Sequence, residues 1–121
     1  MTNDISDADL ETLLDDRRRR YALYCLFRFA TPMSLPTVAD RVTELEYGAP
    51  AETLLDERLR VYMSLYHEHV PLLAEADIVD YHQEDDSLDL AENAASIKPQ
   101  VARKASREFG EQWPQILAER E

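Results

Sequence analysis

Apolar residues recur at intervals of three and four along most of this chain, a spacing typical of amphipathic helices. One region differs, because the segments IVDY (78–81) and SLDL (87–90) alternate apolar and polar residues on either side of the polar turn HQEDD. That alternation predicts a two-stranded hairpin. No other segment is expected to form a strand, so the pattern predicts a mainly α fold with one small β-hairpin.

Residues that favour helix ends indicate where the helices begin. Ser6 or Asp7 is expected to cap the first helix, and Asp15 or Asp16 the second. Ser34, with a proline two residues later, is expected to cap the third. The helices are predicted over residues 7–14, from 15 or 16 to about 29, 34–45 and 56–76, and helical spacing returns beyond residue 93.

The longest helical pattern, over residues 56–76, contains a proline. Pro71 removes one backbone donor and clashes with the preceding turn, so a kink or break is expected near His69. Pro99 is expected to open the last helix. The side of the long helix that should face the core consists of Leu59, Tyr62, Leu65, Tyr66, Val70 and Leu73.

The chain has 121 residues, which fits a single domain, 1–121, with one modest core. Its formal net charge is −12, and Lys98 and Lys104 are its only lysines. A surface rich in carboxylates and poor in lysine indicates a halophilic protein from a salt-rich cytoplasm; the alternative is an ordinary acidic protein. Since about 1 M salt screens charges within roughly 3 Å, the acidity does not exclude DNA binding.

The composition also argues against several classes of protein. No run reaches the roughly 18 apolar residues of a membrane span, and the polar N-terminus does not resemble a secretory signal, so we expect a cytoplasmic protein without membrane contact. Cys25, the only cysteine, is expected to be a buried structural thiol. His67 and His69 diverge by about 200° on a helix, so His69 is expected to pack at the kink. No catalytic motif is present, and we expect no enzyme activity, cofactor or metal.

Three segments carry a family resemblance. They are LLDDRRRRYALYCL (13–26), MSLPTVADRVTELE (33–46) and RLRVYMSLYHEHVPLLAEADIVDY (58–81). Together they resemble a family of small haloarchaeal winged-helix domains of uncharacterised function, in which a basic residue, Val-Tyr, Ser-Leu-Tyr, a His before Leu-Pro or Val-Pro, and a Val-x-Tyr strand recur. Where that family commonly has glycine, this chain has Asp77, which can take a left-handed turn at some steric cost.

The resemblance covers about residues 10–90 and implies a winged helix-turn-helix fold with a helical extension over 93–121. It also implies a transcriptional regulator that binds double-stranded DNA, with helix 56–70 in the major groove. It identifies no operator and no effector. The ribbon around HQEDDS is expected to approach the DNA backbone, although its tip carries Glu84, Asp85 and Asp86, which repel phosphate unless cations intervene. The alternative is that the helix alone touches DNA.

Four residues of the long helix are the main candidates for DNA contact. Arg60, Ser64 and His67 follow one another at steps of four and three, and Arg58 lies near the helix start, where residues that enter the groove usually lie. Arginine can bond guanine with two hydrogen bonds, and Ser and His can bond bases or phosphates. The alternative is a solvated helix face paired with nearby glutamates.

Residues 17–20 are four successive arginines, which point around the whole helix and cannot all face one phosphate chain. Pairing within the chain, at i, i+4 from Asp15 and Asp16, is one alternative. Contact of Arg17 or Arg18 with phosphate is the other.

The tail is rich in large apolar residues. It suggests a homodimer that presents two recognition helices, or else packing of the tail on the protein's own helices. The residues concerned are Phe109, Trp113, Ile116 and Leu117.

Two functions are compatible with this pattern of residues. The first is a homodimeric, DNA-binding regulator of transcription. The second is a non-enzymatic protein-interaction module built on a winged-helix scaffold, in which the same long helix or the tail binds a protein partner.

Overall fold

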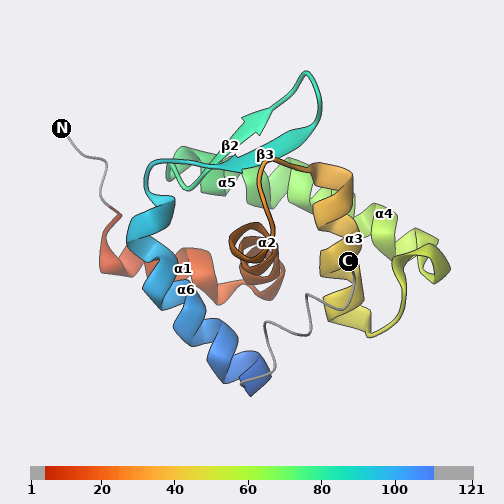
Figure 1. The fold of residues 1–121 in the computed structure, drawn as a ribbon, viewed down its shortest axis with the longest axis horizontal. Helices are drawn as coiled ribbons and strands as arrows, with labels where there is room; N and C mark the ends of the chain where they lie inside the picture. The colour runs from red at the N-terminus through yellow and green to blue at the C-terminus, as the bar shows by residue number, and fades with distance from the viewer. Residues whose placement is uncertain (1–4, 111–121) are drawn as a thin grey trace.

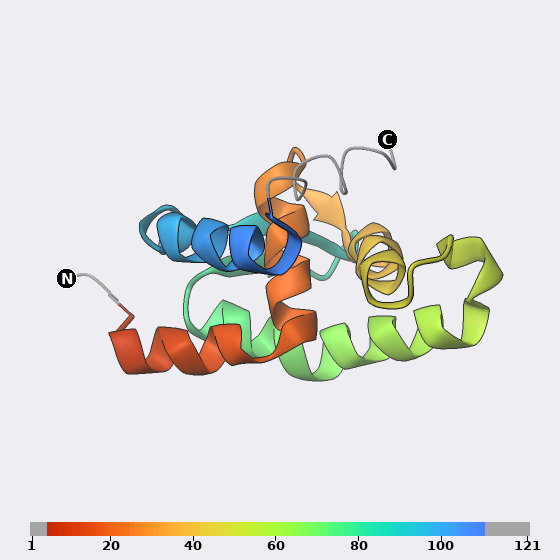
Figure 2. The same cartoon turned by 90° about the horizontal axis from the view of Figure 1, so that it is seen from below.

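The computed structural model describes residues 5–110, which form helices around a small three-stranded antiparallel sheet (Figures 1 and 2). The elements in chain order are α1 (Asp7–Asp15), α2 (Arg17–Arg28), β1 (Met33–Ser34), α3 (Leu35–Tyr47), the 3-10 turn η1 (Ala51–Thr53), α4 (Leu55–Ser64), the π-helical turn η2 (Leu65–His69), α5 (Val70–Glu75), β2 (Val79–His82), β3 (Ser87–Leu90) and α6 (Ala94–Phe109).

Three helices begin at side chains that the sequence identifies as caps. Ser6 accepts a hydrogen bond from the Asp9 amide at the start of α1. Asp16 does the same for the Arg19 amide in α2, and Ser34 for the Thr37 amide in α3. Each cap satisfies an amide that has no partner within its own helix. The predicted starts of these helices are therefore confirmed.

The sheet has one strand more than the sequence indicates. The order is β1–β3–β2, and Met33 of β1 pairs with Leu88 of β3. The expectation that strands occur only in the hairpin was wrong, since a two-residue strand is too short to produce a visible alternation. The hairpin itself is confirmed, with Val79 paired to Leu90 and His82 paired to Ser87.

Two aspartates take left-handed backbone conformations around the hairpin. Asp77 has φ 62° where α5 passes into β2, and Asp86 has φ 54° in the turn before β3. Aspartate tolerates this region better than most residues with a side chain, because its short polar group can bond locally. The left-handed turn considered for Asp77 is thus the one observed.

Helix α2 passes through the centre of the molecule, seen end-on in Figure 1, and the other elements surround it. Every residue from Tyr21 to Leu26 is buried, and Phe27 is partly exposed at the edge of the core. Cys25 is fully buried, as predicted, and burial raises the pKa of its thiol to about 12. It is therefore an unreactive, structural thiol.

The long helical segment follows the lower edge of Figure 2 as α4, η2 and α5 in succession. The irregularity expected near His69 is a π turn, in which the Val70 amide bonds to the Leu65 carbonyl five residues earlier. The expected core-facing stripe was partly wrong. Leu59 is 61% exposed and Tyr66 37% exposed, whereas Val61 and Leu65 are fully buried.

Helix α6 begins at Ala94, five residues before Pro99, so the prediction that this proline opens the helix was wrong. The start follows the apolar spacing of Ala94, Ile97 and Val101, all of which are buried. The end of α6 packs on α2, where the ring of Phe109 lies 5.6 Å from that of Tyr21. No helix within residues 5–110 is long and apolar enough to cross a membrane.

Candidate nucleic-acid interface

The helix proposed to read DNA turns an apolar surface to solvent. Val61 and Leu65 face the core, and the opposite side carries large apolar side chains that are 37 to 62% exposed. Among the described elements, none covers the side of α4 that faces away from α3 (Figure 2). We call this surface the outer face of α4: Leu55, Leu59, Met63 and Tyr66.

A groove adjoins the outer face. It lies between α3 and α4, has a volume of about 330 Å³ and is mostly apolar. Pro36 and Ala39 line it from α3, while Leu55, Leu59 and Tyr62 line it from α4. An exposed helix face beside an apolar groove is typical of a protein contact surface.

The two arginines proposed to read bases differ in their exposure and in their ion pairs. Arg58 forms an ion pair with Asp40 of α3, and its side chain is 41% exposed. Arg60 is 68% exposed and lies 3.8 Å from Glu57, one turn earlier on the same helix. The alternative of a solvated face paired with nearby glutamates thus describes Arg60, which lies beside Glu57, better than Arg58, whose partner is an aspartate of α3.

Ser64 and His67 differ from Arg60 in their surroundings. Ser64 is half-buried and lines a depression of about 300 Å³ that it shares with Asp16, the N-cap of α2. His67 is exposed and makes an edge contact with the ring of Tyr66, 4.9 Å away. The π turn changes the angular position of His67, which follows Leu65, whereas Ser64 precedes the turn and lies four residues after Arg60 in the regular part of α4.

Two tyrosines hold the hairpin against α4. The hydroxyl of Tyr62 donates to Asp86 Oδ2 at 2.7 Å, and that of Tyr81 donates to Asp86 Oδ1 at 2.6 Å. The hydrogen bond to this carboxylate raises the pKa of Tyr62 to about 12. The tip of the hairpin is therefore braced on α4 through an acidic residue, a contact that no local sequence signal reveals.

The arginines at 17–20 pair within the chain, but not with Asp15 and Asp16 as side-chain partners at i, i+4. Arg18 makes two bonds to Glu46 of α3, at 2.7 and 2.8 Å, and Arg20 makes two to Glu108 of α6, at 2.9 and 2.8 Å. Helix α2 begins only at Arg17, so Asp15 and Asp16 lie outside it. Arg17, 59% exposed, is the one of the four with the most open side chain.

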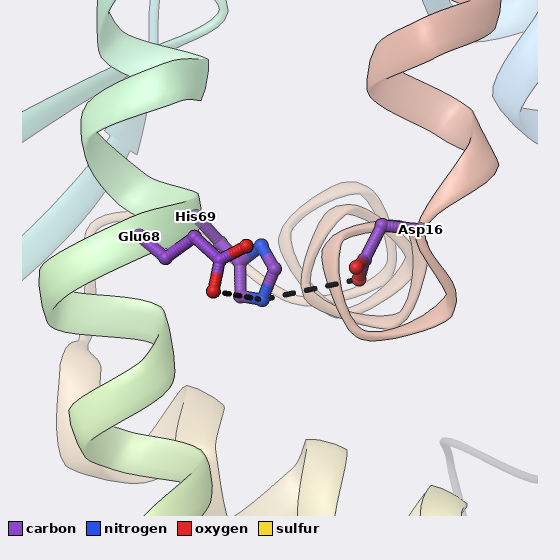
Figure 3. A group of neighbouring side chains, drawn as sticks. All are labelled: Asp16, Glu68 and His69. Carbon is purple, nitrogen blue, oxygen red and sulfur yellow. Dashed lines mark ion pairs between the residues drawn. The ribbon is translucent and has the colours of Figure 1, made fainter.

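Arg19 is buried, and its guanidinium ties three segments together. It donates to the carbonyls of Leu13 and Thr12, at 2.7 and 3.1 Å, and lies 3.2 Å from Nδ1 of His69. His69, 3% exposed, thus packs at the π turn as predicted. Its Nε2 lies 3.9 Å from both Asp16 and Glu68, and the three side chains point toward one another in Figure 3.

The cluster of Asp16, Glu68 and His69 has atoms close enough together for a metal ion. A metal-bound histidine uses one ring nitrogen as the ligand and donates a hydrogen from the other. Here Nδ1 faces the guanidinium of Arg19, which can only donate, so Nδ1 holds the lone pair and the hydrogen is on Nε2. The nitrogen that faces the carboxylates is therefore the wrong one for a ligand, and the cluster does not fit a metal.

Burial lowers the pKa of His69, with Arg19 and Arg18 acting in the same direction and Asp16 and Glu68 opposing them. The folded chain therefore resists protonation of this ring, while the unfolded chain accepts a proton near pH 6.5. The His69 contribution to stability is complete above that pH and is lost as the pH falls from there toward the lower folded pKa.

Replacing His69 by leucine tests this dependence, because leucine can neither accept the hydrogen bond from Arg19 nor take up a proton. At pH 7.5 we expect the variant to be less stable by about 1–3 kcal/mol, because Arg19 loses a buried partner. The difference in free energy of unfolding between the two proteins should be smaller at pH 5.5, since only the parent chain has the imidazole ring, which takes up a proton when that chain unfolds. Denaturant unfolding at both pH values measures it, and parallel pH curves for the two proteins would contradict the assignment.

The model of a family described as a domain of unknown function, DUF7344, matches residues 11–89. The chain belongs to the DUF7344 family. The match runs from α1 to β3, leaves out α6, and nearly coincides with the residues over which the sequence resemblance extends. Searches of curated proteins and of solved structures found no match.

Proposed function

We propose that this DUF7344 domain is a non-catalytic interaction module on a winged helix-turn-helix scaffold, and that it binds a protein through the outer face of α4. One observation carries the proposal: four large apolar side chains, Leu55, Leu59, Met63 and Tyr66, are 37 to 62% exposed along α4 and the start of the π turn. Burial of such side chains contributes about 25 cal/mol per Å², which favours a protein partner over the polar grooves of DNA.

The scaffold is supported by the element order. Helices α3 and α4 pack on each other and are followed by the β2–β3 ribbon, the order of a helix-turn-helix pair with a wing. The brace from Tyr62 and Tyr81 to Asp86 keeps that ribbon beside α4.

DNA reading by α4 is the second candidate, and the exposure of Arg60 and His67 favours it. Two observations argue against DNA reading: Arg58 is paired with Asp40, and Ser64 lies beside the start of α2. Of Arg17 and Arg18, Arg17 remains the candidate for phosphate contact, because Arg18 makes two hydrogen bonds to Glu46.

A gel-shift experiment separates the two functions. If α4 reads DNA, the full chain retains a preferred duplex from its own promoter region at about 2 M salt, and replacing Arg58 and Arg60 by alanine abolishes that shift. If the domain instead binds a protein, we expect no sequence-dependent gel shift at about 2 M salt, and the double alanine variant should behave like the parent chain. The melting temperature should stay nearly constant, because an exposed ion pair contributes at most about 1 kcal/mol.

A further inference from the structure

We infer that a hollow between α1 and α6 binds a small dipolar molecule with one ammonium group and two carboxylates, the chemistry of an acidic amino acid. The hollow has a volume of about 420 Å³, and it lies where α6 passes close to α1 in Figures 1 and 2. Sites for small molecules occupy about 300–1,000 Å³. Neither helix contributes to the outer face of α4, so the site is independent of the proposed function.

The two walls of the hollow carry opposite charges. Asp7 and Glu11 are four residues apart on α1, so they lie on the same side of that helix and form an acidic wall. Arg103 and Arg107 have the same spacing on α6, and Lys104 lies beside them. These three residues form a basic wall on the other side of the hollow.

The two walls are not joined by ion pairs. Within residues 5–110, no ion pair links a carboxylate of the acidic wall to a cation of the basic wall, and these five side chains have no other ion pair there. By contrast, Arg18, Arg20 and Arg58 each pair with a carboxylate of another helix. The charges of both walls are therefore available to a ligand that fits between them.

The charge of the lining selects the ligand. Three cations minus two carboxylates give the hollow a charge of +1, in a chain whose net charge is −12. An acidic amino acid carries the opposite charge. Its carboxylates can accept paired hydrogen bonds from the arginines, while its ammonium group lies against the acidic wall. A ligand with negative charges alone, such as a dicarboxylate or a phosphate chain, is repelled by the acidic wall.

The base of the hollow suits the rest of such a molecule. Leu10 and Leu14 line it and belong to the core, so they offer an apolar contact to the methylene groups of the ligand. Gln100 also lines it, and its Oε1 is shielded from solvent and has no hydrogen-bond donor among the described residues. An acceptor without a donor is unfavourable, so turning this amide toward the ammonium group of the ligand satisfies it.

The homodimer expected from the tail concerns other residues. Phe109, one of its four candidate contacts, packs within its own chain on Tyr21 and Tyr24 and does not line the hollow. The remaining three candidates lie outside the described residues: Trp113, Ile116 and Leu117.

Titration of the full chain with L-glutamate tests the inference, with the backbone amide signals followed by NMR. At constant ionic strength, set with sodium chloride, we expect signals of α1 and α6 to shift and to saturate. The dissociation constant should be on the order of 1 mM for a ligand of about ten non-hydrogen atoms. Glutarate, which lacks the ammonium group, and 4-aminobutyrate, which lacks one carboxylate, should each bind about tenfold more weakly, because each loses a charge-assisted contact. The absence of a saturating shift by about 50 mM glutamate, or equal binding of glutarate, overturns the inference.

Matched variants locate the site. Arg103→Gln and Arg107→Gln together should weaken glutamate binding by about tenfold, whereas Lys98→Gln, at an exposed lysine of α6 that does not line the hollow, should leave it unchanged. Glu11→Gln should weaken the binding of glutamate but not that of glutarate, because only glutamate offers an ammonium group to the acidic wall. All four side chains are exposed, so the variants should fold, which their melting temperatures check. Equal losses for Lys98→Gln and the double variant, or a Glu11→Gln variant that binds glutamate as the parent chain does, overturn the inference.

Discussion

Replacing Arg19 by methionine should lower the free energy of unfolding by about 3 kcal/mol. Methionine retains much of the apolar stem but leaves the carbonyls of Leu13 and Thr12 without their donors and His69 without its partner. Buried groups left unpaired cost about 1–3 kcal/mol each, and only part of this is recovered by relaxation. Denaturant unfolding at constant salt measures the loss.

Arg17→Met is the matched control from the same run of arginines. Arg17 is largely exposed, and its contacts are long: 5.8 Å to the Tyr21 ring and 3.9 Å to Glu46. Its replacement should therefore change the free energy of unfolding by less than about 0.5 kcal/mol. Equal losses for the two variants would show that Arg19 is not the structural member of the run.

Replacing Leu65 by alanine should cost about 2–5 kcal/mol, because this side chain is fully buried at the start of the π turn and its removal leaves a cavity. Leu59→Ala is the matched control on the same helical segment. Its leucine is mostly exposed, and in dilute protein we expect a change within about 0.5 kcal/mol. Thermal or denaturant unfolding of both variants measures the contrast, and a large loss for Leu59→Ala would contradict the outward orientation of this residue.

Much of the fold could be predicted from local signals. A cap needs only a side chain three residues before the amide that it bonds, so Ser6, Asp16 and Ser34 were recognisable in the sequence. The hairpin was visible because each strand is long enough to alternate. The two residues of β1 were not, since their pairing with β3 depends on a segment more than fifty residues away.

The candidate site was harder to predict. The sequence identified the long helix as the functional element, but which of its sides faces the core depends on how α3 and α2 pack against it. Leu59 and Leu65 both fit a spacing of three and four residues, but they lie about 120° apart around the helix, and packing decides which of them is buried. The π turn then alters the side on which His67 lies relative to Arg60.

The sequence by itself determined where helices and the hairpin form, that Cys25 is inside, and that the chain is acidic, because these follow from neighbouring residues and from composition. Only the tertiary structure decided the role of each arginine, since the partners of Arg18, Arg19 and Arg20 are 28, 50 and 88 residues away in the chain. The physical reason is the same in each case. Burial and ion pairing depend on which surfaces meet in space. Helical periodicity shows which residues share one side of a helix, but not which other segment packs against that side.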